Sequence, residues 1–123
     1  DVLAAVQHDR AGAVALFVVQ VRDHDGGRDV VALDYSAHPS ADCVAETIAR
    51  GYAARPGIER LALVHRVGSL VVGDLAIVAA VSAAHRGEAF QVCADLVEEV
   101  KARLPIWKHQ QFADGTQEWV GIG

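Results

Sequence analysis

The cationic side chains of this sequence are unevenly divided between two residue types. Of 11 lysines and arginines only two are lysines, Lys101 and Lys108, and they lie on either side of Pro105. A lysine that is partly buried near other cations can lose its proton, whereas a guanidinium effectively cannot. Lys101 and Lys108 are therefore candidate acids, bases or nucleophiles. Composition alone leaves a second interpretation open, in which both are surface lysines favoured by the dipole at a helix C-terminus.

A candidate anion site lies at His85-Arg86. The pair follows an apolar segment and opens a predicted helix. The free N–H groups and the dipole at a helix N-terminus attract anions, so a histidine and an arginine at this position would strengthen a phosphate site. The alternative interpretation is an ordinary solvated first turn of a helix.

Arg22 is a third candidate, because it ends a strand that is otherwise apolar. The segment that follows, residues 23–29, contains Gly26 and Gly27 among polar residues and is predicted to be a loop. Polar residues at strand ends beside loops often line binding sites. The position of Arg22 therefore indicates a binding role, although this signal alone is not specific.

The other reactive residue types favour structural roles. His65-Arg66 lies within an apolar strand, where alternation directs one of the two side chains toward the core. Cys43 and Cys93 are both expected on apolar helix faces, where a cysteine behaves as a small hydrophobe. The six histidines show neither HxxxH nor HxH spacing, and the sequence has no glycine motif of the P-loop or dinucleotide type. We therefore expect no bound metal and no cofactor.

Apolar periodicity predicts the elements that must position these residues. Runs rich in β-branched residues are joined by short turns such as Asp114-Gly115, which favours antiparallel or mixed pairing. We therefore predict an α+β fold, with two main helices packed on an antiparallel or mixed sheet. Ser40 is expected to cap the first helix, and Phe90 and Cys93 begin the apolar stripe of the second. The predicted strands cover residues 13–22, 30–35, 60–67, 74–82, 106–112 and 117–120, with a short apolar piece at 69–72, and the predicted helices cover 40–55 and 85–104.

Length and composition narrow the class of protein. The 123 residues suit one domain over 1–123, and an apolar content of 52% excludes a disordered chain. A net charge of −5 argues against general nucleic-acid binding, which needs a basic face. No apolar run is long enough to cross a membrane, and the first residues lack the basic flank and apolar stretch of a signal peptide. We therefore expect a cytoplasmic protein that binds neither nucleic acid nor membrane.

Three strings in the sequence are specific in combination: VHRVG at 64–68, VSAAHRGEAF at 81–90 and PIWK at 105–108. FVVQVR at 17–22, LDY at 33–35, Gly73-Asp74 and Trp119-Val120 accompany them at compatible spacing. Together these segments cover nearly the whole chain and resemble the catalytic (large) subunit family of molybdopterin synthase. The chain departs from that family just before Arg22, where Val19 and Gln20 replace the usual glycine and basic residue, and at Asp23, which replaces a common asparagine.

The resemblance implies an α/β-hammerhead-like fold and a homodimer that binds small ubiquitin-like subunits to form a heterotetramer. The partner's C-terminal Gly-Gly would carry a thiocarboxylate, and its sulfur would be transferred to cyclic pyranopterin monophosphate to form the dithiolene of molybdopterin, in molybdenum cofactor biosynthesis. The family's two essential lysines fall on Lys101 and Lys108, its anion-binding pair on His85 and Arg86, and its strand-end arginine on Arg22. The residues expected to line the same pocket are Gln20, Val21, His109 and Gln110.

The departures at Val19 and Gln20 leave a second function open. The chain would then be a non-catalytic dimeric module that binds a small anion or a ubiquitin-like partner. Formation of molybdopterin from a thiocarboxylated small subunit and cyclic pyranopterin monophosphate would separate the two functions.

Overall fold

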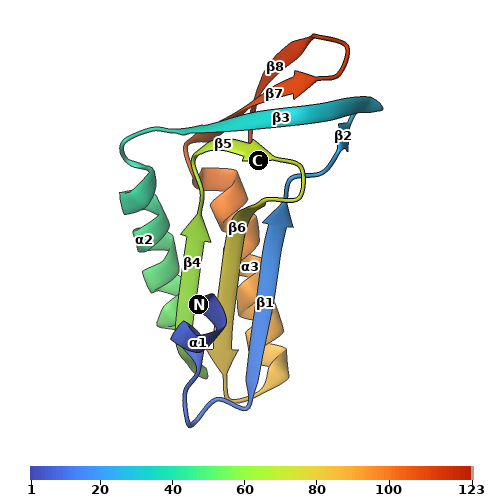
Figure 1. Cartoon of the computed structure of the whole chain (residues 1–123). Coiled ribbons are helices and arrows are strands. Elements are labelled where there is room, and N and C mark those ends of the chain that lie inside the picture. Colours follow the sequence, from blue (N-terminus) through green and yellow to red (C-terminus); the bar gives the residue numbers. More distant parts are fainter. Residues whose placement is uncertain (123) are drawn as a thin grey trace.

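Two antiparallel sheets form the frame of the molecule in the computed structural model, which describes residues 1–122 (Figure 1). The strands are β1 (Ala13–Gln20), β2 (His24–Asp25), β3 (Arg28–Ala37), β4 (Ile58–His65), β5 (Gly68–Val71), β6 (Leu75–Ala83), β7 (Ile106–Phe112) and β8 (Gln117–Gly121). The first sheet has the order β1-β6-β4, and the second has the order β2-β3-β7-β8, with β5 also paired to β3. The strands of the second sheet run across one end of the first (Figure 1), like the head of a hammer on its handle.

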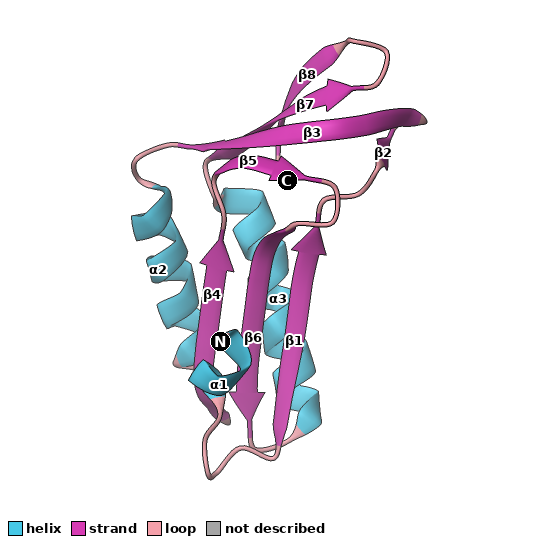
Figure 2. Cartoon of the chain, in the orientation of Figure 1, coloured by secondary structure: helices cyan, strands magenta, loops and turns pink. Residues whose placement is uncertain are grey.

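Three helices complete the fold: α1 (Val2–Val6), α2 (Ala41–Ala53) and α3 (Arg86–Arg103). The two long helices cover one face of the three-stranded sheet, and the short α1 lies on the other face (Figure 2). Buried residues of α3 recur at three- and four-residue spacing from Ala89 through Cys93 and Leu96 to Val100, as expected for an amphipathic helix. No helix within the described residues is long and apolar enough to cross a membrane.

Helix α3 connects the two ends of the molecule. It begins after His85, whose backbone is extended, and ends before Leu104, because Pro105 cannot continue a helix. Arg86 and Lys101 lie in this one unbroken helix of 18 residues. At 1.5 Å per residue they are about 22 Å apart along the helix axis.

The predicted α+β fold with two main helices is confirmed, and every strand pairing among residues 1–122 is antiparallel. The sequence pattern does not predict α1 or β2. Part of the predicted loop at 23–29 is instead a tight hairpin, because Gly26 and Gly27 adopt positive φ angles of 58° and 79°. This turn brings His24 and Asp25 into register with Asp29 and Arg28.

Three side chains lie elsewhere than the pattern predicts. Cys43 is exposed on α2, because the buried face of that helix is centred on Ile48 and Tyr52. Phe90 is 66% exposed, since it projects from the edge of the buried stripe of α3. Ser40 precedes α2, but its hydroxyl is hydrogen-bonded to His38 Nδ1 at 2.8 Å and does not cap the helix.

The alternation expected at His65-Arg66 is present. The His65 side chain is 12% exposed and faces inward, whereas that of Arg66 is 51% exposed. His65 Nε2 lies 3.6 Å from Asp42 Oδ1, and its buried Nδ1 has no hydrogen-bond partner among residues 1–122. A structural role for His65 therefore stays a prediction.

Burial predicts different consequences for the loss of each cysteine. Cys93 is 5% exposed within the larger core cluster, whereas Cys43 is exposed. We expect Cys93→Ala to lower the free energy of unfolding by about 1 kcal/mol, because the lost sulfur leaves a small cavity. We expect Cys43→Ala to change it by less than about 0.5 kcal/mol. Urea unfolding followed by circular dichroism measures both values, and equal losses would contradict the burial described for α2 and α3.

Candidate active site

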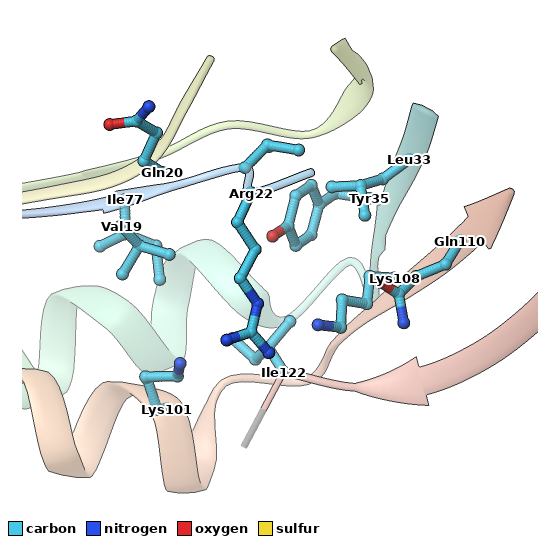
Figure 3. Close-up of a pocket in the computed structure, with 11 residues that line it drawn as sticks. Val19, Gln20, Arg22, Leu33, Tyr35, Ile77, Lys101, Lys108, Gln110 and Ile122 are labelled. Carbon is cyan, nitrogen blue, oxygen red and sulfur yellow. The ribbon is translucent and has the colours of Figure 1, made fainter. Parts of the chain in front are cut away.

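A cavity of about 300 Å³ lies where the two sheets meet the C-terminal end of α3 (Figure 3). The cross-strand neighbours Val19 and Ile77 contribute an apolar part of its wall. Concave sites of this kind, apolar with a few convergent polar groups, are typical of small-molecule binding. The lining residues are Val19, Gln20, Val21, Arg22, Leu33, Tyr35, Ile77, Lys101, Lys108, Gln110 and Ile122.

Three cations reach this cavity from three different elements. Arg22 follows the end of β1, Lys101 lies in the last turn of α3, and Lys108 lies in β7. The chain reverses at Pro105, so the two lysines face the same space from opposite sides of the turn, and the Arg22 side chain extends toward them (Figure 3). Neither ammonium has an ion-pair partner within 4.0 Å among the described residues. The cavity therefore presents positive charge that is not fully compensated.

Three of the predicted flanking residues also line the cavity. Gln20 and Val21 precede Arg22, and Val21 belongs to the smaller core cluster. Gln110 is 2% exposed, and its amide Nε2 donates a hydrogen bond of 2.6 Å to Asp25 Oδ2. Six of the nine predicted site residues are thus brought together by the fold of one chain.

His109 does not line the cavity, which corrects the expectation that it does. Side chains alternate along a β-strand, so Lys108 and Gln110 of β7 face the cavity and His109 faces away. On that outer face His109 stacks on Trp119, with ring centroids 4.5 Å apart, and is hydrogen-bonded to Gln117 Oε1 at 2.8 Å.

His85 and Arg86 lie at the opposite end of α3 from the cavity. Together with Gly12, Ala13 and Ala84 they line a separate open hollow. The chain segments there approach so closely that a Cβ on Gly12 would lie 2.5 Å from the carbonyl oxygen of Ala84. Within one chain, therefore, this pair and the two lysines do not share a pocket.

A carboxylate behind the lining residues offsets part of the positive charge. The hydrogen bond from Gln110 holds the pKa of Asp25 below its usual range, and the nearby charges of Lys108 and Arg22 act in the same direction. Asp25 Oδ1 also accepts a hydrogen bond of 3.4 Å from Arg22 Nη2. Asp25 is consequently ionised at neutral pH and lies beside the cations of the cavity.

Sequence reasoning did not identify Tyr35 or Asp25 as parts of the site. Tyr35 is opposite Lys108 in the β3–β7 register. The signals in the sequence are its period-two relation to Leu33 and its place in the LDY string. Burial raises the pKa of the Tyr35 phenol, which therefore stays neutral and can donate a hydrogen bond. Asp25 has no signal of its own, because its partner Gln110 is distant in sequence.

The cavity is suited to binding anions and to donating protons. A guanidinium offers several donors in a fixed geometry, and an ammonium can both pair with an anion and give up a proton. Within residues 1–122 no three His, Cys, Asp or Glu side chains gather in a way that would hold a metal ion.

Comparison with known proteins identifies relatives over nearly the full length of the chain. The family described as MoaE protein matches residues 1–103. The chain is 41% identical over 123 residues to molybdopterin synthase catalytic subunit 1 of Mycobacterium tuberculosis, covering 98% of this chain and 82% of that protein.

Solved structures share the fold. Molybdopterin synthase from Staphylococcus aureus superposes with a TM-score of 0.86 at 31% identity, over 94% of this chain and 85% of that chain. A complex of subunits 1 and 2 of molybdopterin-converting factor from Helicobacter pylori has a TM-score of 0.73 over 90% of this chain and 73% of that chain, and at 20% identity it shows the common fold alone. The chain therefore belongs to the MoaE family of molybdopterin synthase catalytic subunits.

Proposed function

We propose that the chain transfers sulfur from the thiocarboxylated C-terminus of a small ubiquitin-like subunit to cyclic pyranopterin monophosphate, forming the dithiolene of molybdopterin. The observation that carries this proposal is the convergence of Arg22, Lys101 and Lys108 on one cavity. Membership of the family supports the activity, and the similarity to a protein named as a catalytic subunit supports a second subunit as partner.

The charge of the cavity fits the two reactants. The partner's tail and the pterin phosphate are both anionic, so they repel each other as sulfur approaches carbon. Arg22 and the two lysines would offset this repulsion and hold both anions in one place. Because the cations lie on a strand end, a helix and a strand, their positions are set by the fold before substrate binds.

We assign the phosphate and the pterin to Arg22, His85 and Arg86, and the thiocarboxylate to Lys101 and Lys108. A lysine ammonium would protonate the oxygen that leaves the pterin, or stabilise the oxyanion formed when the acyl intermediate is hydrolysed. Gln20, Val21 and Gln110 would form the walls that orient the substrate.

An exposed apolar face supports a homodimer. The short helix α1 covers part of the face of the first sheet opposite α2 and α3. Beside it, Leu16 and Val18 of β1 and Val64 of β4 lie on either side of β6. Leu16 is 55% exposed and Val64 is 47% exposed. A second copy that covers this face, defined here as the open sheet face, would bury these side chains.

A two-fold axis would also let the two chains share an active site. The cavity lies at one end of the three-stranded sheet, beside Ile77, and the hollow of His85 and Arg86 lies at the other end, beside Ala84. A dimer in which the strands and α3 of the two copies run in opposite directions would bring each hollow to the end at which the partner's cavity lies. The separation of about 22 Å within α3 then no longer prevents both groups from acting on one substrate.

The lysines provide the first test of the activity. Lys101→Ala and Lys108→Ala should each fold normally and lower the rate of molybdopterin formation by at least about 100-fold, because each removes a cation and proton donor from the cavity. Lys→Arg at either position should restore only part of the rate, since a guanidinium keeps its proton.

The assay supplies the thiocarboxylated small subunit and cyclic pyranopterin monophosphate and measures molybdopterin. Arg103→Ala is the matched control, because Arg103 is a cation of the same helix turn that is paired with Glu99 at the surface. Near-wild-type rates for both alanine variants would exclude the proposed role of the lysines.

The cysteines test the origin of the sulfur. If the partner's tail supplies it, no persulfide on this chain is needed, and Cys43→Ala and Cys93→Ala should keep at least about half of the wild-type rate below their melting temperatures. The same assay measures this rate. Abolished transfer in a folded variant would indicate a persulfide relay and reject direct transfer from the partner.

Subunit mixing tests whether the site is shared. Arg86→Ala and Lys101→Ala chains should each be inactive alone. After exchange in equal amounts, half of the dimers are mixed, and each mixed dimer has one site with both lesions and one with neither, so about one quarter of the wild-type activity should return. Lys101→Ala mixed with Lys108→Ala is the control, because both lesions lie in one cavity and no intact site forms. If mass spectrometry confirms exchange and no activity returns, the site lies within one chain.

A further inference from the structure

Arg22 is the only cation of the cavity whose side chain is held by a carboxylate. Arg22 follows the end of β1, and its side chain is 65% exposed, so packing does little to fix its orientation. Its only side-chain partner within residues 1–122 is Asp25, through Arg22 Nη2 and Asp25 Oδ1 at 3.4 Å. The direction of the guanidinium therefore depends on where Asp25 is held.

Asp25 is itself held firmly from two sides. Its backbone belongs to β2, which the Gly26-Gly27 turn closes onto β3. Its Oδ2 accepts the 2.6 Å hydrogen bond from Gln110, a side chain that is 98% buried and has no other side-chain partner among the described residues. An unpaired buried amide costs about 1–3 kcal/mol, so Gln110 keeps the carboxylate in place.

Two other cations lie near Asp25: Lys108, which forms no ion pair with it within 4.0 Å, and Arg28, which is paired with Glu118. Arg28 Nη2 donates a hydrogen bond of 2.6 Å to Glu118 Oε2, and its guanidinium stacks on the Phe112 ring at 3.8 Å from the centroid. Asp25 Oδ1 is thus left for Arg22. Among residues 1–122 no acidic side chain lines the cavity, so Asp25 acts on the cavity from behind Arg22 and Gln110.

We propose that Asp25 is a positioning residue that aims the Arg22 guanidinium into the cavity, where it meets the phosphate of the substrate. This proposal rests on the proposed function for the identity of the substrate, but the orientation of Arg22 is a property of the chain alone. Substrate binding then needs less ordering of Arg22, which improves affinity.

The variant that tests the proposal is Asp25→Asn, which keeps the size of the side chain and one acceptor but removes the charge. Calorimetry should show that cyclic pyranopterin monophosphate binds about tenfold more weakly, because Arg22 loses its charge-assisted bond. The kcat with saturating substrate and thiocarboxylated partner should stay within about twofold, since both lysines keep their side chains and neither forms an ion pair with Asp25 within 4.0 Å. In an Arg22→Ala background the same Asp25→Asn change should alter affinity by less than about twofold.

The competing explanations predict other results. If Asp25 only supports the buried Gln110, affinity falls by the same factor in both backgrounds. If Asp25 only lowers the positive potential, Asp25→Asn binds substrate more tightly. Either result overturns the proposal. Asp23→Asn is the matched control, because the Asp23 carboxylate pairs with His24 at 2.8 Å and not with a lining residue, and its substrate affinity should equal that of the wild type.

A measurement without substrate separates this proposal from the proposed function. Nitrogen-15 relaxation of the Arg22 Nε–H group, assigned by its absence in Arg22→Ala, should report a rigid side chain in the wild type and a mobile one in Asp25→Asn. Unchanged mobility would reject the positioning role even if the enzyme is active. The wild-type chain could make no molybdopterin while the Arg22 side chain becomes more mobile in Asp25→Asn. That pair of results would reject the proposed function and support the positioning role.

Discussion

The packing of α3 on the three-stranded sheet determines where Arg86 and Lys101 lie. Leu96 and Val100 of the helix are fully buried against small residues such as Ala79 and Ala83 of β6. Burying a side chain of this size contributes about 1.5–3 kcal/mol, so a rotation of α3 that exposed its stripe would be strongly unfavourable. The rotation is therefore fixed, and with it the direction of Lys101, since one residue of slip would turn that side chain by about 100°.

The helices and strands hold the three cations of the cavity closer together than their mutual repulsion would otherwise allow. Arg22, Lys101 and Lys108 repel one another, and only Arg22 has an anionic partner among residues 1–122. A flexible loop would relieve the repulsion by moving the side chains into water, but α3 and β7 keep Lys101 and Lys108 facing one space, and the Arg22 side chain extends toward them. A ligand that brings negative charge relieves the same repulsion on binding, so it should stabilise the folded chain as well as occupy the site.

The sequence predicts which residues are candidates for the site better than it predicts which of them line the same cavity. The scarcity of lysine makes Lys101 and Lys108 candidates, and the resemblance to the family favours a functional role over that of ordinary surface lysines. Apolar periodicity gives the elements that carry them. The outward direction of His109 follows from strand alternation once Lys108 is placed inside the cavity. The contact between Asp25 and Gln110 could not be predicted, because β2 has two residues, too few to show a period, and the contact spans 85 positions in the sequence.

Two unsatisfied features of the single chain point to the same arrangement. The hollow at His85 and Arg86 offers donors to an anion, but it has no second group that would act on a substrate. The open sheet face exposes apolar side chains on the side of the three-stranded sheet opposite α2 and α3. A parallel packing of two copies would cover the face yet place each hollow beside the other hollow, where Arg86 and its symmetry mate would repel. Antiparallel packing would cover the same face and bring Arg86 to the end at which the partner's cavity lies, so charge repulsion and the burial of the face favour the same geometry.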